Sequence, residues 1–324
     1  MANHDSSYKY LFSHANMVED LLCGFVKEDW VKDLDFSSLE RVNGSYVSDD
    51  LRGRADDIVW RIKWGNDWLY VYILLEFQST VDRWMAVRMM TYVGLLYQDL
   101  IQSGQIDNNE MLPPILPIVL YNGSHKWTAA TNIKNMIQGI PGGLDKYHPK
   151  LEYLLLAERE YSDVALSSLN NLVAALFRLE NSPTPKDLLA VVRNLLEWLS
   201  GPKQASLRRA FTIWFSRVLF PNHFDKEKRP ALEELTEVEN MLSERVKEWN
   251  KQSLERGMRQ GMQQGMQQGM QQGALQLLQT MLIKKFGALP AEIETKLQNA
   301  TKEQIISWSE HILTANTIGD IFGH

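Results

Sequence analysis

The sequence predicts an α/β core followed by helices, and three observations support this fold class. Residues 5–29 carry apolar side chains at helical spacing. Residues 58–64 and 68–75 are strand-like runs on either side of Gly65-Asn66-Asp67, and residues 115–121 form another short apolar run. Beyond residue 161 the apolar pattern is helical only. The predicted order of the core is helix, three strands, helix, strand.

Composition and charge narrow the class of protein. The 324 residues are 44% hydrophobic and 23% charged, which is typical of a folded protein. The net charge of −6 argues against binding to nucleic acid by bulk electrostatics alone. The single cysteine, Cys23, excludes an intramolecular disulfide. With no apolar run of about 18 residues and no signal-peptide pattern at the N-terminus, we expect a cytoplasmic protein without a membrane anchor.

The second and third strands are predicted to form a hairpin, because Gly and Asn accept the positive φ of tight turns. A loop of Asn66-Asp67 sets Asp57 opposite Glu76, whereas a loop of Gly65-Asn66 makes Asp57 the diagonal neighbour of Glu76 on the same face. The two acids converge in either register, and Gln78 shares the face of Glu76. A three-residue loop would break this relation.

Two carboxylates on adjacent strands repel each other, which favours a compensating cation. Mg²⁺ accepts one or two carboxylates and leaves positions for phosphate oxygens. The alternative is structural: Asp57 is then a strand-edge residue and Glu76 a solvated strand end. Arg52 and Arg54 precede the hairpin and could contact phosphate at its mouth.

The other secondary-structure elements are predicted from hydrophobic periodicity and from residues that break helices and strands. A weaker strand pattern covers residues 39–47, and a helix with an apolar stripe runs to about Ser103. Residues 124–150 are rich in loop-forming residues, residues 161–220 are helical, and residues 226–256 form a highly charged helix.

Residues 257–273 contain a Gly-Met-Gln-Gln repeat. Glycine costs about 1 kcal/mol per residue within a helix, so the repeat is either a flexible tether or a helix that a partner stabilises. We favour the partnered helix, with the same segment of a second chain as the partner. Residues 274–324 form a helical unit too small for a large core of its own, so we expect a homo-oligomer through residues 257–324.

Four stretches of the first 127 residues resemble the Rpn family of recombination-promoting nucleases. These stretches are HDSSYKYLF, RADDIVW, YILLEFQSTVDRWMAVRMMTY and LPPILPIVLYNG. The resemblance implies the PD-(D/E)XK restriction-endonuclease-like core, in the order αβββαβ, with Asp57, Glu76 and Gln78 at its three motif positions. Gln78 stands where that superfamily usually has lysine, so it could orient a water or a phosphate without supplying positive charge.

The resemblance also implies a function. We expect a metal-dependent DNA endonuclease with a role in recombination, mobile elements or defence, in which Asp57 and Glu76 bind Mg²⁺, Mn²⁺ or Ca²⁺. Asp5 and Lys9 match the family's opening motif and would border the site; their other interpretation is a cap and a solvated helix. The alternative function is a non-catalytic DNA- or protein-binding member of the fold that associates with itself through the repeat.

We expect four segments. They are a nuclease core at residues 1–150, a helical extension packed on it at 151–250, the repeat as linker or helix at 251–273, and a small all-α unit at 274–324.

Overall fold

The computed structural model of the chain describes residues 2–42, 57–76, 81–107, 110–139, 142–182, 184–220 and 232–322. The side chains of residues 2–5, 57 and 74–76 lie outside this description. The chain divides into two compact units, residues 1–246 and 247–324. The predicted segment boundaries at 150, 250 and 273 stay predictions.

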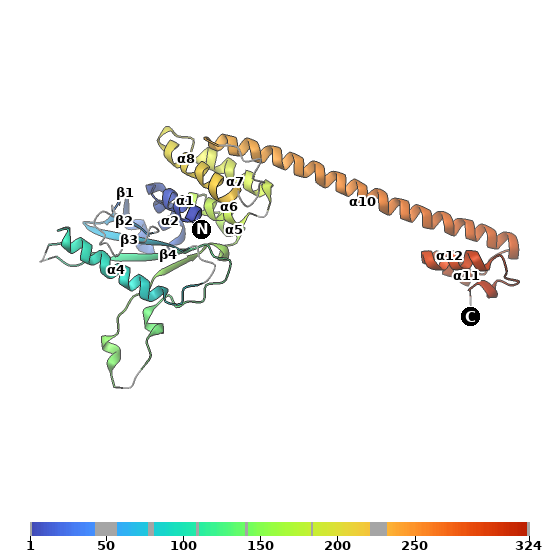
Figure 1. The fold of residues 1–324 in the computed structure, drawn as a ribbon, viewed down its shortest axis with the longest axis horizontal. Helices are drawn as coiled ribbons and strands as arrows, with labels where there is room; N and C mark the ends of the chain where they lie inside the picture. Colours follow the sequence, from blue (N-terminus) through green and yellow to red (C-terminus); the bar gives the residue numbers. More distant parts are fainter. Residues whose placement is uncertain are drawn as a thin grey trace. The chain divides into compact units, whose positions relative to one another are not determined.

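A five-stranded sheet organises the first unit (Figure 1). Its strands, in both spatial and chain order, are β1 (Leu34–Arg41), β2 (Asp57–Trp64), β3 (Asp67–Glu76), β4 (Ile115–Tyr121) and β5 (Leu154–Ala157). The first three strands are antiparallel, whereas β3, β4 and β5 are parallel. This confirms a mixed α/β fold. The strand β5 was not predicted, because a four-residue apolar run does not distinguish a strand from a helix.

The helices of the first unit are mostly amphipathic. They are α1 (Ala2–Leu11), α2 (Ala15–Phe25), α4 (Met85–Gln102), α5 (Asp163–Ser167), α6 (Leu172–Asn181), α7 (Pro185–Trp198) and α8 (Ala205–Trp214), which continues into a π-helical turn, η7 (Phe215–Leu219). Short 3₁₀ helices are η1 (Asp29–Asp33), η3 (Ile133–Met136), η4 (Leu144–Tyr147), η5 (Glu158–Glu160) and η6 (Pro202–Gln204). The single helix expected over residues 5–29 is two helices. The weak strand expected over 39–47 overlaps the end of β1, and residues 43–47 lie outside the described residues.

The turn of the β2–β3 hairpin decides between the two predicted registers. Trp64 pairs with Asp67, so Gly65-Asn66 is the loop, and Gly65 has a φ of +64°. In this register Asp57 pairs with Leu74, two positions before Glu76. Asp57 and Glu76 are therefore diagonal strand positions on one face of the sheet.

The sheet has a hydrophobic core on each face. Helices α1, α2 and α6 cover one face, where Phe12 and Phe177 are fully buried with strand residues such as Ile73. Helix α4 covers the other face and buries Met89 and Tyr92 there. Because both faces are covered, the central strands are almost continuously apolar, as their sequence predicts.

The second unit is helical. Helix α10 (Leu235–Phe286) begins in the first unit and continues through the repeat, and it is followed by α11 (Ala291–Gln298), α12 (Lys302–His311) and α13 (Gly319–Phe322). Leu278, Leu282 and Ile305 are buried in a small core within this unit. The repeat lies within this helix, and the partner expected to stabilise it stays a prediction. Within the described part of the chain, no helix is both long and apolar enough to cross a membrane.

Candidate active site at the carboxyl edge of the sheet

The three parallel strands end together at one edge of the sheet, which we call the carboxyl edge. Glu76 of β3 pairs with Tyr121 of β4, and Tyr121 pairs with Ala157 of β5. Asp57 is the first residue of β2 and so reaches the same edge. A polar residue stands at the end of each of these apolar strands: Glu76 is the last residue of β3, Asn122 follows β4 and Glu158 follows β5.

The structure brings some predicted site residues to this edge and leaves others outside its description. The backbones of Asp57 and Glu76 are described, but their side chains are not. Gln78, Arg52 and Arg54 lie outside the described residues.

Asp5 and Lys9 are in α1, and this helix contacts β3. Tyr8 of the same helix accepts a hydrogen bond from Asn122, the residue after β4. The helix therefore passes beside the carboxyl edge.

A basic side chain that the sequence did not single out lies on the face of Asp57 and Glu76. Strand alternation puts these two positions with Tyr72, whose ring stacks on Tyr92 of α4 at 6.0 Å between ring centroids. Arg88, one turn earlier in α4, donates to Asp82 Oδ2 at 2.9 Å and to the Tyr92 hydroxyl at 3.2 Å. Because α4 follows β3 in the chain, this earlier turn lies toward the carboxyl edge. The Arg88 side chain is partly exposed. Apart from its position on the polar side of helix α4, the sequence gave no indication of a role for it.

A buried polar network lies beneath the carboxyl edge, on the face covered by α1. The Tyr8 hydroxyl lies 3.2 Å from Glu158 Oε2 and 3.1 Å from Glu180 Oε1. Asn122 donates to the Tyr8 hydroxyl at 3.2 Å and to Glu158 Oε2 at 3.3 Å. Glu158 directly follows β5, and its side chain is 1% exposed. The network therefore links α1, α6 and the ends of two parallel strands.

The chemistry of the network requires a bound proton. A tyrosine hydroxyl has one proton, so it donates to only one of the two carboxyl groups. The other carboxyl group must be protonated to donate to the same hydroxyl. Burial raises the pKa of Glu158 well above its ordinary value, and repulsion from Glu180 raises it further. Burial also raises the pKa of Glu180, to about 7.

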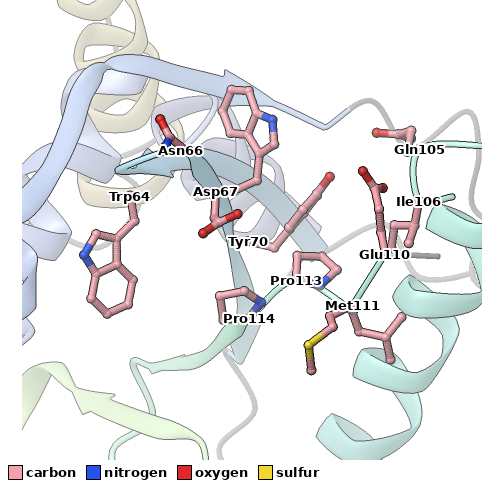
Figure 2. Close-up of a pocket in the computed structure, with 12 residues that line it drawn as sticks. Trp64, Asn66, Asp67, Tyr70, Gln105, Ile106, Glu110, Met111, Pro113 and Pro114 are labelled. Atoms are coloured by element: carbon pink, nitrogen blue, oxygen red, sulfur yellow. The ribbon is translucent and has the colours of Figure 1, made fainter.

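Two recesses flank the ends of the sheet. One, of about 450 Å³, lies at the carboxyl edge, and Tyr121, residues 123–127, Ala157, Arg159 and Glu160 line it. Another, of about 850 Å³, lies at the hairpin turn, between Trp64, Tyr70 and the loop before β4 (Figure 2). The second recess is the larger of the two, but it lies at the opposite end of β3 from Glu76. It is therefore not part of the site that Asp57 and Glu76 define.

The donor set at the carboxyl edge suits a hard cation. Asp57 and Glu76 are carboxylates on adjacent strands, and oxygen ligands of this kind are those that Mg²⁺, Mn²⁺ and Ca²⁺ accept. Among the side chains that the structure describes, no cluster of three or more His, Cys, Asp or Glu could hold a metal ion.

The fold and this edge define a mixed α/β protein with paired acids at the end of a five-stranded sheet. Residues 2–208 match the model of a family described as "Putative transposase, YhgA-like", and the chain belongs to that family. It is 31% identical to the recombination-promoting nuclease RpnD of Escherichia coli O157:H7 over 121 residues, 37% of this chain and 45% of RpnD. It is 28% identical to RpnA of Escherichia coli K12 over 120 residues, 37% of this chain and 40% of RpnA.

These relatives differ in the activity that their names describe. "Putative inactive recombination-promoting nuclease-like protein YjiP" of Escherichia coli K12 is 32% identical over 89 residues, 28% of this chain and 86% of YjiP. The chain spans less than half the length of RpnD and of RpnA. No solved structure gives a significant match.

Proposed function

We propose that the chain is a divalent-metal-dependent DNA endonuclease of the PD-(D/E)XK type that acts in the cytoplasm. The observation that carries this proposal is the register of the hairpin, in which Asp57 and Glu76 are diagonal positions on one face at the carboxyl edge. Membership of a family whose relatives include recombination-promoting nucleases supports the same function. A role in recombination, mobile elements or defence follows from those relatives' names and is part of the proposal.

Each site residue has a proposed role. Asp57 and Glu76 hold Mg²⁺ or a similar ion, which polarises a phosphodiester and lowers the pKa of bound water when it is present. Gln78 orients the attacking water or the scissile phosphate through its amide. Asp5 and Lys9 of α1 border the site, and Arg52 and Arg54 contact the DNA backbone before the hairpin. Arg88, which is ion-paired with Asp82 on the same face, is the proposed source of the positive charge that Gln78 does not supply.

The metal requirement gives the first test. Purified protein is incubated with supercoiled plasmid in Mg²⁺, Mn²⁺ or Ca²⁺, and in EDTA. We expect nicked plasmid to accumulate with at least one of the ions and none to accumulate in EDTA, because the carboxylates alone supply no electrophile. Cleavage that continues unchanged in EDTA would contradict the proposal.

A second candidate function is a non-catalytic DNA- or protein-binding protein on the same fold. Two observations favour it: Gln78 replaces the usual lysine, and one relative's name describes it as inactive. This candidate predicts DNA binding without plasmid nicking in every ion. The plasmid assay therefore separates the two functions.

We further propose that the chain forms a homo-oligomer through residues 257–324. Along the repeat, Met258, Met262, Met266 and Met270 are each more than half exposed. Apart from the neighbouring residues and the backbone of the same helix, a Cβ built on any of the five repeat glycines meets no described atom within 4 Å. The glycines thus weaken the helix without serving a contact within the chain, which is expected if they let a second helix approach closely.

Replacement of Gly261 and Gly265 by alanine tests this proposal. We expect the double variant to be more helical, by about 1 kcal/mol per site, and yet to associate more weakly, because the methyl groups block close approach. Gln263 and Gln267 lie about 160° around the helix from the glycines, so their replacement by alanine is the control and should leave association unchanged. Light scattering and circular dichroism measure the two effects. Association that is equally strong in the glycine variant would contradict the proposal.

A further inference from the structure

The recess at the carboxyl edge begins one strand away from Glu76. Its floor is formed by Tyr121 and Ala157, the last residues of β4 and β5. Tyr121 pairs directly with Glu76 on the neighbouring strand. Adjacent strands are about 4.8 Å apart, so the edge of the recess lies about one strand spacing from the backbone of Glu76.

The recess has a positively charged rim. Lys126 and Arg159 are both exposed at its border, and neither makes an ion pair with any side chain that the structure describes. His125 adds a third basic group, and Glu160 is the one acid among the lining residues. Because the whole chain carries a net charge of −6, this excess of cations is a local exception. Cations at such a position attract phosphate.

Buried residues fix the positions of the loops that form the rim. A Cβ at Gly123 would lie 2.1 Å from the Tyr121 hydroxyl, so the turn after β4 lies directly against that ring. Trp127 packs edge-on against Tyr121 at 4.8 Å between ring centroids and donates to the Tyr153 hydroxyl at 3.2 Å. Arg159 follows Glu158, which belongs to the buried polar network. The loop with Lys126 and the loop with Arg159 therefore both begin at a residue that is packed in the interior.

We propose that this recess binds a backbone phosphate of DNA, one that flanks the phosphate at Asp57 and Glu76, through Lys126 and Arg159. This inference rests on the proposed function, since it names DNA as the ligand. Duplex DNA has one phosphate per about 3.4 Å of axis on each strand. A strand that crosses Glu76 thus carries the next phosphates past the neighbouring strand ends, where the recess lies. The Glu160 carboxylate limits the site to partners with strong negative charge or with contacts elsewhere on the protein.

The test is the salt dependence of DNA binding by the full chain. A labelled duplex is titrated in EDTA, where a metal-dependent nuclease does not cut, between about 50 and 200 mM salt. The double variant Lys126→Gln and Arg159→Gln is compared with wild type. The matched control is Lys186→Gln and Lys203→Gln, which removes two exposed lysines from α7 and η6, away from the sheet edge.

We expect the recess variant to bind at least tenfold more weakly at the lowest salt, and its log–log salt slope to fall by about 1, because loss of the one phosphate contact releases about 0.9 fewer counterions. The control variant should match wild type. Equal weakening in both variants would overturn the proposal, because general charge would then explain binding. Equal binding by the recess variant and wild type would overturn it as well. The plasmid assay is scored separately: loss of binding in the recess variant with no nicking by wild type would sustain the DNA site and refute the nuclease.

Discussion

Replacement of Asp57 by asparagine or of Glu76 by glutamine is expected to lower the rate of DNA cleavage at least a thousandfold. Each change removes one negative charge at nearly constant shape, and with it a ligand for the catalytic ion. Metal-ion catalysis supplies several kcal/mol of transition-state stabilisation, and about 4 kcal/mol corresponds to a factor of 10³. Initial rates of plasmid nicking measure the effect.

The matched control for these variants is Asp67→Asn. Asp67 is the first residue of β3, at the hairpin end of the strand that Glu76 terminates. Its replacement should leave the cleavage rate unchanged. Without metal, Asp57→Asn and Glu76→Gln should also be at least as stable to heat as wild type, because each removes repulsion between two acids. Wild-type cleavage rates in both variants would contradict the proposed roles.

The buried network predicts that the first unit loses stability as pH rises. The ordinary glutamate pKa is 4.5, and that of Glu180 in the folded chain is about 7. Between these values the folded state binds more protons than the unfolded state, so the free energy of unfolding falls with rising pH. The slope is about 1.4 kcal/mol per pH unit for each proton bound. Tyr8 and Asn122 contact the pair, and the positive charge of Arg159 acts on both carboxyl groups through space and lowers their pKa values.

The variant Glu158→Gln tests the network while it keeps a side chain of nearly the same size at position 158. The glutamine amide supplies permanently the donor that a protonated carboxyl group supplies only at lower pH, so Tyr8 can donate to Glu180. We expect the thermal midpoint of the variant to depend less on pH between 5 and 7 than that of wild type, and to exceed it near pH 8. Glu160→Gln, an exposed neighbour, is the control and should follow wild type. Identical pH profiles for wild type and Glu158→Gln would refute the shared proton.

Local features of the fold were predictable from sequence because their causes are local. Gly65-Asn66 specifies a tight turn, and the turn fixes the positions of Asp57 and Glu76 in the hairpin. The choice between two registers required the structure, since both leave the acids on one face. The break between α1 and α2 was missed because apolar residues on both sides of it continue the same helical spacing.

The polar features beneath and beside the edge were beyond sequence reasoning. Tyr8 and Glu180 are 172 residues apart, and Tyr8 and Asn122 are 114 apart. From sequence alone, a glutamate in a helix is predicted to be exposed to solvent unless its buried partners are known. The same applies to Lys126 and Arg159, which become one rim only because β4 and β5 are neighbours.

The most direct measurement of the central claim is the binding of Mn²⁺, a spectroscopically visible substitute for Mg²⁺, to wild type, Asp57→Asn, Glu76→Gln and Asp67→Asn. We predict a site in wild type and Asp67→Asn that is at least tenfold weaker in the other two variants, with cleavage rates that follow its occupancy. Equal Mn²⁺ binding by all four proteins would show that Asp57 and Glu76 hold no ion, and it would contradict the account.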